Sequence, residues 1–346
     1  MEKKKLIYLD RNENHYGPAP RCFKVLSKPN FNKLSAYSRD FSRGIKSRLS
    51  ERLALDFGIE ESRVLLGYGG EDILKQIVHC QLQKGDKILI PAYSWWYYKA
   101  IAEEVEGVKV EYPLTKGEKT FYYDVDEMIR LVKTEKPKMI LVASPNNPTG
   151  NAIDLSELKR FLNSTGDAVV VVDEAYTVFA NPDTSYVKEL VNNYHNLLVV
   201  RTFSKYYALA GIRIGFALMG TNLAKFSRFS ARYLGYNRLS ERIALAALDS
   251  DDYYSEMRVK MLDDIEMFFN EFSALPGFTP YKSLANFILV EIPQEIKVPL
   301  KNHLLSKGLV IKFMDEDNLR SHVRISIGTQ EENRMLMDAV KEFVNS

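Results

Sequence analysis

The chain has 346 residues, 46% of them apolar and 27% charged, a composition typical of a globular protein and a length that allows two domains. A formal net charge of +2, with only the short Lys3-Lys4-Lys5 run standing out, argues against nucleic acid or a membrane surface as the partner. The chain has two cysteines, too few for a disulfide framework or a cysteine-based metal site. It shows neither a membrane span of roughly 18–20 apolar residues nor a signal-peptide core, so we expect a cytoplasmic protein.

From about residue 71 to residue 219, short apolar runs alternate with helical patterns. Apolar residues repeat at helical spacing over 73–82, and Lys84-Gly85-Asp86 ends that helix. Asp154, with Glu157 three residues later, has the capping-box spacing of another helix start. The expected strands are 87–90, 108–112, 139–142, 168–172, 197–200 and 214–219. This alternation predicts an α/β fold with a mostly parallel central sheet and helices on both faces.

The pattern changes after residue 237. Residues 238–275 are dominated by helical periodicity, and three short strand candidates follow at 286–291, 308–313 and 323–327. The first 30 residues have no strong pattern and could pack on either part. We therefore expect a large α/β domain over residues 31–237. Residues 1–30 together with 238–346 would form a smaller α+β domain.

Polar residues follow three of the expected strands. Ligands of open α/β sheets bind outside the carboxyl ends of the strands, so these residues form the candidate site. One strand leads into the rigid turn Ser144-Pro145-Asn146-Asn147-Pro148-Thr149-Gly150, which either holds Asn147 against a ligand or simply connects a strand to a helix. The other two lead into Asp173-Glu174-Ala175-Tyr176 and Arg201-Thr202-Phe203-Ser204-Lys205.

Each of these residues alone has an ordinary structural explanation, such as a helix cap for Asp173 or a solvated charge for Lys205. The combination is more informative. Gly67-Tyr68-Gly69-Gly70 precedes a helix and offers free backbone N–H groups to an anion, and Arg213 lies just before another strand. An anion pocket, a carboxylate and a lysine at one sheet edge are what pyridoxal 5'-phosphate requires. A nicotinamide site is less favoured because no G-x-G-x-x-G follows a strand.

These motifs resemble those of a known enzyme family. The turn at 144–150, Asp173-Glu174-Ala175-Tyr176, Thr202-Phe203-Ser204-Lys205 and Ala210-Gly211-Ile212-Arg213 resemble the signatures of fold-type I, class I/II aminotransferases, which depend on pyridoxal 5'-phosphate. Within that family the chain looks most like the histidinol-phosphate aminotransferase group. The terminal motifs Asn12-Glu13-Asn14-His15-Tyr16-Gly17-Pro18 and Val323-Arg324-Ile325-Ser326-Ile327-Gly328-Thr329 carry this finer resemblance, which runs from about residue 8 to the end.

The resemblance implies catalytic roles for three residues. Lys205 would form the Schiff base with the cofactor and then move the proton between the substrate and cofactor carbons. Asp173 would pair with the pyridinium nitrogen. Tyr176, together with Asn147, would hydrogen-bond the phenolic oxygen of the ring.

The resemblance also implies how the cofactor is held. Tyr93 would stack on the ring face, and Tyr37 would reach the cofactor phosphate of a neighbouring subunit, which makes the active unit a homodimer. Loop packing is the alternative for Tyr37. The phosphate would be held by the backbone N–H groups of two residues, by hydroxyls and by a guanidinium, namely Gly70, Glu71, Thr202, Ser204 and Arg213.

For the substrate, the resemblance implies Arg324 as the partner of a carboxylate, with Tyr16 and Asn147 beside it. Lys312 stands where the subgroup usually has an arginine for the substrate phosphate, so it keeps the charge but loses the fork geometry. His15 stands where the subgroup usually has proline, and we interpret it as a loop residue.

Two further features have alternative interpretations. The aromatic run Trp95-Trp96-Tyr97-Tyr98 predicts core packing, with one wall of an apolar substrate pocket as the alternative. The basic cluster Arg228, Arg232, Arg238 and Arg242 predicts a solvated helix face, with a second anion site as the alternative.

The leading functional hypothesis is an aminotransferase that moves an amino group between glutamate and a keto compound, with histidinol phosphate as the best single substrate. A phospho-amino-acid decarboxylase is the second hypothesis, because the bond held perpendicular to the cofactor ring decides which bond breaks. An aminotransferase for an aromatic or another phosphorylated substrate stays open. A cofactor-binding regulator is disfavoured, since such proteins carry a DNA-binding domain and the expected fold accounts for the whole chain.

Overall fold

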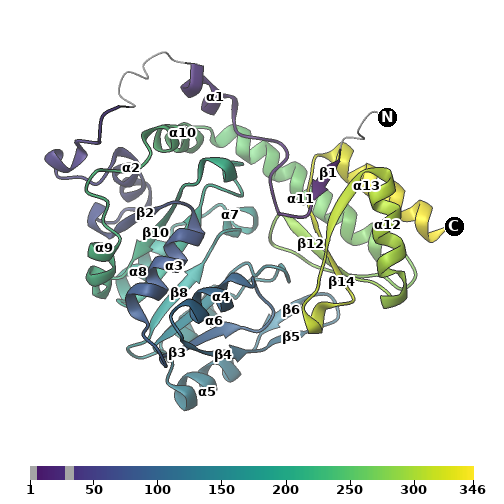
Figure 1. Cartoon of the computed structure of the whole chain (residues 1–346), viewed down its shortest axis with the longest axis horizontal. Coiled ribbons are helices and arrows are strands. Elements are labelled where there is room, and N and C mark those ends of the chain that lie inside the picture. Colours follow the sequence, from purple (N-terminus) through teal and green to yellow (C-terminus); the bar gives the residue numbers. More distant parts are fainter. Residues whose placement is uncertain (1–5, 28–34) are drawn as a thin grey trace.

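The computed structural model describes residues 6–27 and 35–346. The Lys3-Lys4-Lys5 run and the domain boundary expected between residues 30 and 31 lie outside these ranges. A seven-stranded sheet forms the centre of the larger part, on the left of Figure 1. Its strands in spatial order are β2 (Val64–Gly67), β10 (Gly215–Met219), β9 (Leu197–Thr202), β8 (Val169–Asp173), β7 (Met139–Ala143), β3 (Lys87–Pro91) and β4 (Val108–Tyr112).

Most of this sheet is parallel. The neighbours β9, β8, β7, β3 and β4 run in one direction, whereas β10 is antiparallel to both β9 and β2. The mostly parallel sheet predicted from the sequence is therefore confirmed. Its register pairs Ala143 with Asp173 and Asp173 with Val200, so the residues after β7, β8 and β9 emerge side by side.

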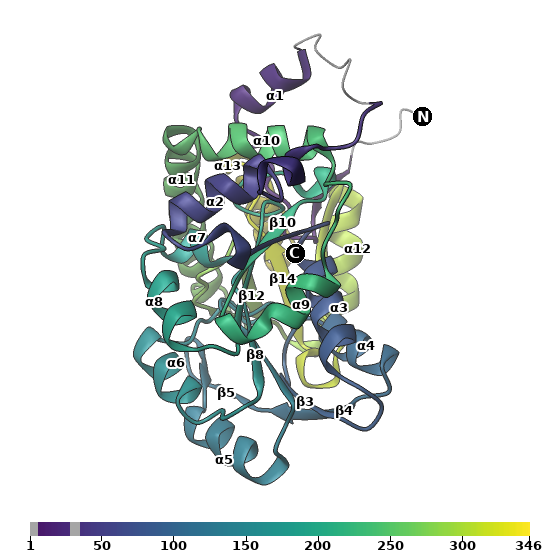
Figure 2. The same ribbon diagram turned by 90° about the vertical axis from the view of Figure 1, so that its left-hand side faces the viewer.

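Helices cover both faces of the large sheet, as the view along its edge shows in Figure 2. Strand side chains alternate between two apolar cores, because Leu141 and Val171 pack toward one helical layer while Ile140 and Val170 pack toward the other. The first layer consists of α3 (Gly70–Gln81), α4 (Tyr97–Glu104) and α9 (Ala224–Phe229), and the second of α5 (Val125–Glu135), α6 (Leu155–Leu162) and α8 (Tyr186–Asn193).

A second sheet lies to the right in Figure 1. The strands expected in the C-terminal part are confirmed and pair antiparallel, whereas the N-terminal strand joins them in parallel. The segment Ile7–Leu9, for which no strand was predicted, thus forms one edge of this sheet. Its order is β1 (Ile7–Leu9), β13 (Leu309–Phe313), β14 (His322–Ser326), β12 (Phe287–Glu291) and β11 (Thr279–Tyr281).

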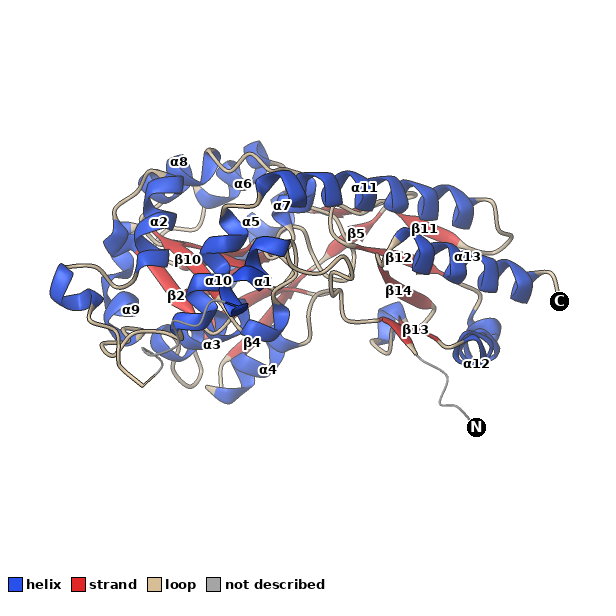
Figure 3. Cartoon of the chain, turned by 90° about the horizontal axis from the view of Figure 1, so that it is seen from above, coloured by secondary structure: helices blue, strands red, loops and turns tan. Residues whose placement is uncertain are grey.

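Helices connect the two sheets. α11 (Asp251–Ser273) runs from α7 (Thr177–Ala180) to the small sheet along the top of Figure 3. The small sheet packs against α11 and is flanked by α12 (Lys297–Lys307) and α13 (Gln330–Val344).

One helix expected in the small domain contacts the N-terminal helices instead of the small sheet. α10 (Arg238–Leu248) packs against α1 (Pro20–Ser27) and α2 (Arg48–Phe57). The division of the chain into residues 31–237 and residues 1–30 with 238–346 stays a prediction.

Some local features differ from the sequence expectations. β2 has only four residues, all buried, which is too short for a periodic signal. The small hairpin of β5 (Leu114–Lys116) and β6 (Phe121–Tyr123) was likewise not predicted. Asp154 precedes α6 as expected, but its side chain makes no capping hydrogen bond, so the predicted capping box is wrong.

Candidate active site

A cavity of about 560 Å³ lies where the carboxyl ends of β7, β8 and β9 face the second sheet. Ligands of open α/β sheets bind at such an edge. Most residues predicted for the site share this one cavity, whereas Tyr16, Tyr37 and Tyr93 are not on its wall. The predicted residues on the wall are Gly70, Glu71, Asn147, Asp173, Tyr176, Thr202, Ser204, Lys205, Arg213, Lys312 and Arg324.

Lys205 follows β9 and places a primary amine in the cavity. Its Nζ donates a hydrogen bond to the backbone carbonyl of Arg11 at 3.0 Å and lies 5.8 Å from the centre of the Tyr176 ring. The amine is thereby held between the N-terminal segment and the end of β8. A lysine in this position can act as a nucleophile toward a carbonyl and as a proton carrier.

Asp173 is the last residue of β8, and both of its carboxylate oxygens accept hydrogen bonds from the protein. The backbone N–H of Ala175 donates to Oδ1 at 3.0 Å, and the hydroxyl of Tyr98 donates to Oδ2 at 2.7 Å. Burial raises the pKa of Asp173, while these two hydrogen bonds lower it. A carboxylate in such a place suits a cationic partner in the cavity.

Tyr176 lies one turn beyond Asp173, with its ring packed edge-on against Phe287 at 5.2 Å. Its hydroxyl oxygen accepts a hydrogen bond from the side-chain amide of Asn12 at 3.0 Å. Asn12 is 1% exposed and has a left-handed backbone with φ of +54°. The phenol is therefore fixed from behind and keeps its own proton available for the cavity.

Asn147 and Arg324 contact each other across the two sheets. Nη1 of Arg324 donates to Oδ1 of Asn147, and Nη2 donates to the backbone carbonyl of Asp10. Burial lowers the pKa of Arg324, and its Nε is buried with no partner in the described part of the chain. A guanidinium in this state fits an anionic ligand group.

The turn that carries Asn147 is held by its neighbour Asn146, which is fully buried. The Asn146 amide donates to the carbonyl of Tyr93 and to the hydroxyl of Thr149 at 2.6 Å, and its oxygen accepts from Ser94 at 2.6 Å. In this turn, Asn147 faces the cavity, whereas Asn146 holds the turn together through its buried hydrogen bonds.

An anion pocket forms at the start of α3. Gly69 has φ of +88°, and a Cβ at this position would lie 2.8 Å from Nη2 of Arg213. Arg213 also contacts the carbonyl of Tyr68 and the carboxylate of Glu71, both at 3.3 Å. The hydroxyl of Thr202 donates to that of Ser204 at 2.9 Å. Helix N–H groups, hydroxyls and a guanidinium are the donors that a phosphate accepts.

Tyr93 does not reach the cavity. It packs edge-on against Phe121 at 6.2 Å, because the turn at 144–150 binds its carbonyl and fixes the strand end. Trp95 and Trp96 line the cavity instead, and Trp96 is 62% exposed. The prediction that Tyr93 faces the ring therefore finds no support, and core packing is the wrong interpretation for Trp96.

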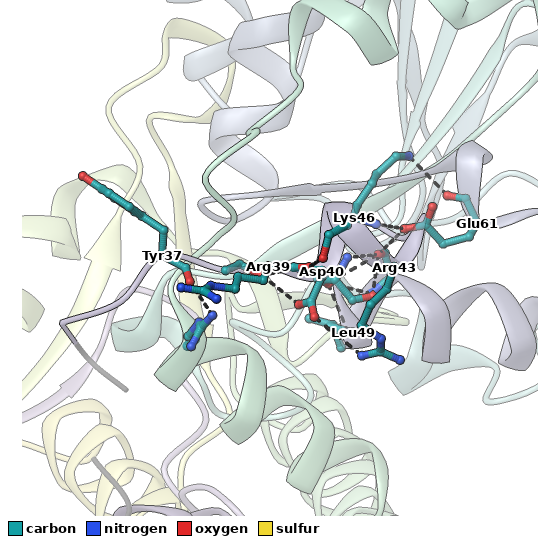
Figure 4. Close-up of polar contacts among 12 residues, drawn as sticks. Tyr37, Arg39, Asp40, Arg43, Lys46, Leu49 and Glu61 are labelled. Atoms are coloured by element: carbon teal, nitrogen blue, oxygen red, sulfur yellow. Dashed lines mark hydrogen bonds and ion pairs between the residues drawn. The ribbon is translucent and has the colours of Figure 1, made fainter. Parts of the chain in front are cut away.

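Tyr37 is 71% exposed, and Figure 4 shows its ring projecting away from the polar cluster around Asp40, Lys46 and Glu61. Its carbonyl accepts a hydrogen bond from Arg238 at 2.6 Å. A ring in this position is free to contact another molecule, so its role at a neighbouring subunit stays a prediction.

Two other candidates from the N-terminal motif lie away from the cavity wall. Burial raises the pKa of Tyr16, and its hydroxyl is buried without a partner among the described residues. His15 is a loop residue, as expected. Its Nδ1 lies 2.8 Å from Oε2 of Glu332, which is in the first turn of α13. The role of Tyr16 toward a substrate stays a prediction.

Lys312 lies on β13 directly opposite Arg324 on β14, so two basic side chains share one wall. Nζ of Lys312 lies 3.3 Å from a carboxylate oxygen of Asp315, and Glu316 also lines this side. The basic pair fits an anionic group at the outer end of a ligand. The cluster Arg228, Arg232, Arg238 and Arg242 does not line this cavity, so the second-anion-site alternative finds no support here.

The cavity wall also contains residues that sequence reasoning missed. Asp10, Arg11 and Asn12 reach it from the segment after β1, and Tyr98 reaches it from α4. Asn12 is the first residue of the N-terminal motif, so the sequence contained a signal that could have identified it as a site residue. Tyr98 is separated from Asp173 by 75 residues, and no local pattern links the two.

Comparisons with known proteins agree with this geometry. Residues 4–340 match the family model of class I and II aminotransferases. The chain is 32% identical to histidinol-phosphate aminotransferase 1 of Arabidopsis thaliana over 98% of this chain and 78% of that protein. It is 31% identical to histidinol-phosphate aminotransferase of Ruminiclostridium cellulolyticum, with 96% and 91% covered.

Solved structures share the fold. The histidinol-phosphate aminotransferase of Sinorhizobium meliloti, in complex with pyridoxal-5'-phosphate, superposes with a TM-score of 0.88 at 24% identity. The match covers 99% of this chain and 92% of that one. The predicted fold-type I architecture is thus confirmed for the part of the chain that the structure describes.

Proposed function

The chain belongs to the class I and II aminotransferase family and is a pyridoxal 5'-phosphate-dependent aminotransferase, and we propose that it moves an amino group between histidinol phosphate and 2-oxoglutarate. The proposal for the substrate is supported by the relatives, which carry that activity in their names and match almost the full chain. It is also supported by the wall that bears Arg324 and Lys312.

The cavity fits the cofactor. A side chain on Gly69 would come within 2.8 Å of Arg213, so the phosphate pocket requires glycine there. The amine of Lys205, the carboxylate of Asp173 and the phenol of Tyr176 line the same cavity as this pocket. When bound, pyridoxal 5'-phosphate supplies an aldehyde that condenses with amines and a ring that accepts electrons from the substrate carbon.

Each residue on the wall has a side chain that suits one part of the cofactor. The amine of Lys205 would hold the aldehyde end of the cofactor and could move a proton at the substrate carbon that bears nitrogen. The carboxylate of Asp173 would hold a proton on the ring nitrogen. The hydroxyl of Tyr176 and the amide of Asn147 would hydrogen-bond the ring's phenolic oxygen. Their shared cavity is the observation that carries the proposal.

The substrate's anionic group would be held by Arg324, which offers a buried Nε without a partner in the described ranges. Lys312 adds a second positive charge on the opposite strand. A lysine binds a phosphate as a point charge, so this site can accept histidinol phosphate without the arginine of the subgroup. The same wall would accept a phospho-amino acid, and decarboxylation is therefore the second candidate reaction.

We also propose a homodimer in the cytoplasm. Tyr37 is exposed, and its ring projects away from the polar cluster around Asp40, Lys46 and Glu61, so it is available to contact a neighbouring subunit. None of the described helices combines the length and the apolar character that crossing a membrane requires. Sedimentation of the cofactor-loaded protein tests the dimer, and a monomer with full activity would reject it.

The test of the function is a half-reaction. The cofactor-loaded protein is mixed separately with histidinol phosphate, glutamate, phenylalanine and O-phosphothreonine. We expect rapid loss of the cofactor's yellow colour with histidinol phosphate and with glutamate. If phenylalanine alone caused loss of the yellow colour, histidinol phosphate would be rejected as the substrate in favour of an aromatic amino acid. Release of carbon dioxide from O-phosphothreonine would identify a decarboxylase.

Lys205→Ala is the matched control. Because Lys205 lies at the cavity and not in the apolar cores, the variant should fold and bind the cofactor weakly without turnover. Retained turnover in Lys205→Ala would reject the assignment of Lys205 as the catalytic amine.

A further inference from the structure

Tyr98 lies beside Asp173 and, like it, lines the cavity. It is 3% exposed, and its hydroxyl donates to Oδ2 of Asp173 at 2.7 Å. Oδ1 of the same carboxylate accepts from the N–H of Ala175 at 3.0 Å. Each oxygen thus has one donor supplied by the protein, and the carboxylate still lines the cavity.

The tyrosine is held in place by its own packing. Its ring lies edge-on to Trp95 at 5.9 Å, and Ile101 and Ala102 of α4 are buried in the same apolar core. Burial and the charge of Asp173 raise the pKa of Tyr98 well above its usual range. The phenol therefore stays protonated and can only donate to the carboxylate.

Other charged and titratable groups face Asp173 as well. Lys205 favours its charge from the cavity, whereas Glu174 disfavours it. Glu174 is engaged by Arg201 at 2.6 Å on the buried side. The hydroxyl of Tyr123 donates to the carbonyl of Ala143 and is therefore not the donor to Asp173. Among the described residues, Tyr98 is the one whose side chain donates a hydrogen bond to this carboxylate.

We propose that Tyr98 is a positioning residue, which keeps the carboxylate of Asp173 ionised and aimed at the cofactor's ring nitrogen. The inference rests on the proposed function, because that nitrogen belongs to pyridoxal 5'-phosphate. The backbone N–H of Ala175 engages only Oδ1 of Asp173, whereas the hydroxyl of Tyr98 engages Oδ2, so the two donors together fix the carboxylate. Burial alone would favour the protonated acid, which cannot hold a proton on the ring.

The test is Tyr98→Phe, which removes the donor and keeps the ring. We expect cofactor binding to weaken about tenfold and the acid limb of its pH dependence to move up by about one pH unit, since a hydrogen bond to a charged acceptor is lost. The dissociation constant of the cofactor is measured against pH by fluorescence of the cofactor-stripped protein. In turnover, kcat should fall more than KM changes.

Tyr112→Phe is the matched control. Tyr112 is also fully buried, and its hydroxyl donates to a backbone carbonyl, that of Leu141, at 3.0 Å. We expect its cofactor affinity and pH dependence to match the wild type. Equal losses in Tyr98→Phe and Tyr112→Phe would overturn the proposal, because they would show a general packing defect.

Two further variants keep the test decisive. In Asp173→Asn, Tyr98→Phe should cause no additional shift of the acid limb. Replacing Tyr98 by 3-fluorotyrosine keeps the packing and strengthens the donor, so the acid limb should move down instead of up. An unchanged acid limb in both Tyr98→Phe and the fluorinated protein would overturn the proposal. A wild-type protein that binds no pyridoxal 5'-phosphate would reject the proposed function instead.

Discussion

Asn12 makes four hydrogen bonds, and one of them connects the N-terminal segment to the catalytic phenol. Its N–H donates to Oγ of Ser326 at 2.7 Å, its carbonyl accepts from Asn286 at 3.0 Å, and its amide donates to Tyr176. The hydroxyl of Ser326 donates in turn to Oδ1 of Asn12 at 3.3 Å. Asn12 makes these contacts with φ of +54°, a region that asparagine tolerates better than most residues.

Replacing Asn12 tests this role in two steps. Asn12→Gly removes the contact with Tyr176 but keeps the backbone relaxed, whereas Asn12→Ala removes the contact and adds strain. We expect both variants to lose catalytic rate, and the alanine variant to unfold with about 1 kcal/mol less stability than the glycine variant. Urea unfolding and kcat measure the two effects. Equal stability of the two would show that the backbone strain is negligible.

At the scale of the element, the two adjacent asparagines of the turn at 144–150 have different roles, one in stability and one in the cavity. Asn146 is fully buried with three side-chain hydrogen bonds, while Asn147 faces the cavity and Arg324. Asn146→Ala should lower the free energy of unfolding by about 2–4 kcal/mol, because it leaves buried partners unpaired.

Asn147→Ala is the companion variant of the same turn. It should cost only about 1 kcal/mol of stability, since Arg324 can turn to water in the cavity, while cofactor affinity and kcat fall. Denaturant unfolding and cofactor titration separate the two outcomes. The assignment would be reversed if Asn147→Ala were the less stable variant.

Continuous apolar runs were enough to predict β3, β7, β8, β9 and β10, because a strand covered on both faces is continuously apolar. β4 was predicted as well, although this edge strand is mostly exposed. The polar residues after β7, β8 and β9 were predicted as site residues because parallel strands end at one edge of the sheet. Tyr98 and Trp96 were expected to pack in the core, with one wall of a substrate pocket as the alternative. They lie in a helix start beside the cavity, and only tertiary packing brings Tyr98 to Asp173.

At the scale of the whole molecule, the N-terminal segment joins the two sheets at the cavity. β1 belongs to the small sheet, yet the residues that follow it bind side chains from both parts. Lys205 of the large sheet donates to the carbonyl of Arg11, and Arg324 of the small sheet donates to that of Asp10. The cavity therefore depends on how this segment lies between the sheets.

A buried carboxyl group away from the cavity makes stability depend on pH. Glu241 lies on α10 and is 7% exposed, and its Oε1 has no hydrogen-bond partner among the described residues. The pKa of Glu241 is raised to about 7, because burial and the charge of Asp40 together outweigh the lowering by Ser47 and Arg238. The folded protein thus binds a proton that the unfolded chain has released between about pH 4.5 and pH 7.

Stability should therefore fall as pH rises through this window, and Glu241→Gln should remove the effect. We expect the variant to gain at most about 3 kcal/mol of unfolding free energy at pH 8 and nothing at pH 5, where the native carboxyl is already neutral. Urea unfolding at the two pH values measures the gain. The exposed Glu256→Gln on α11 is the control and should leave both values unchanged. A loss of stability in Glu241→Gln at pH 8 would instead mean that the ionised carboxylate is bound by a partner, so that its charge supports the packing of α10 on α2.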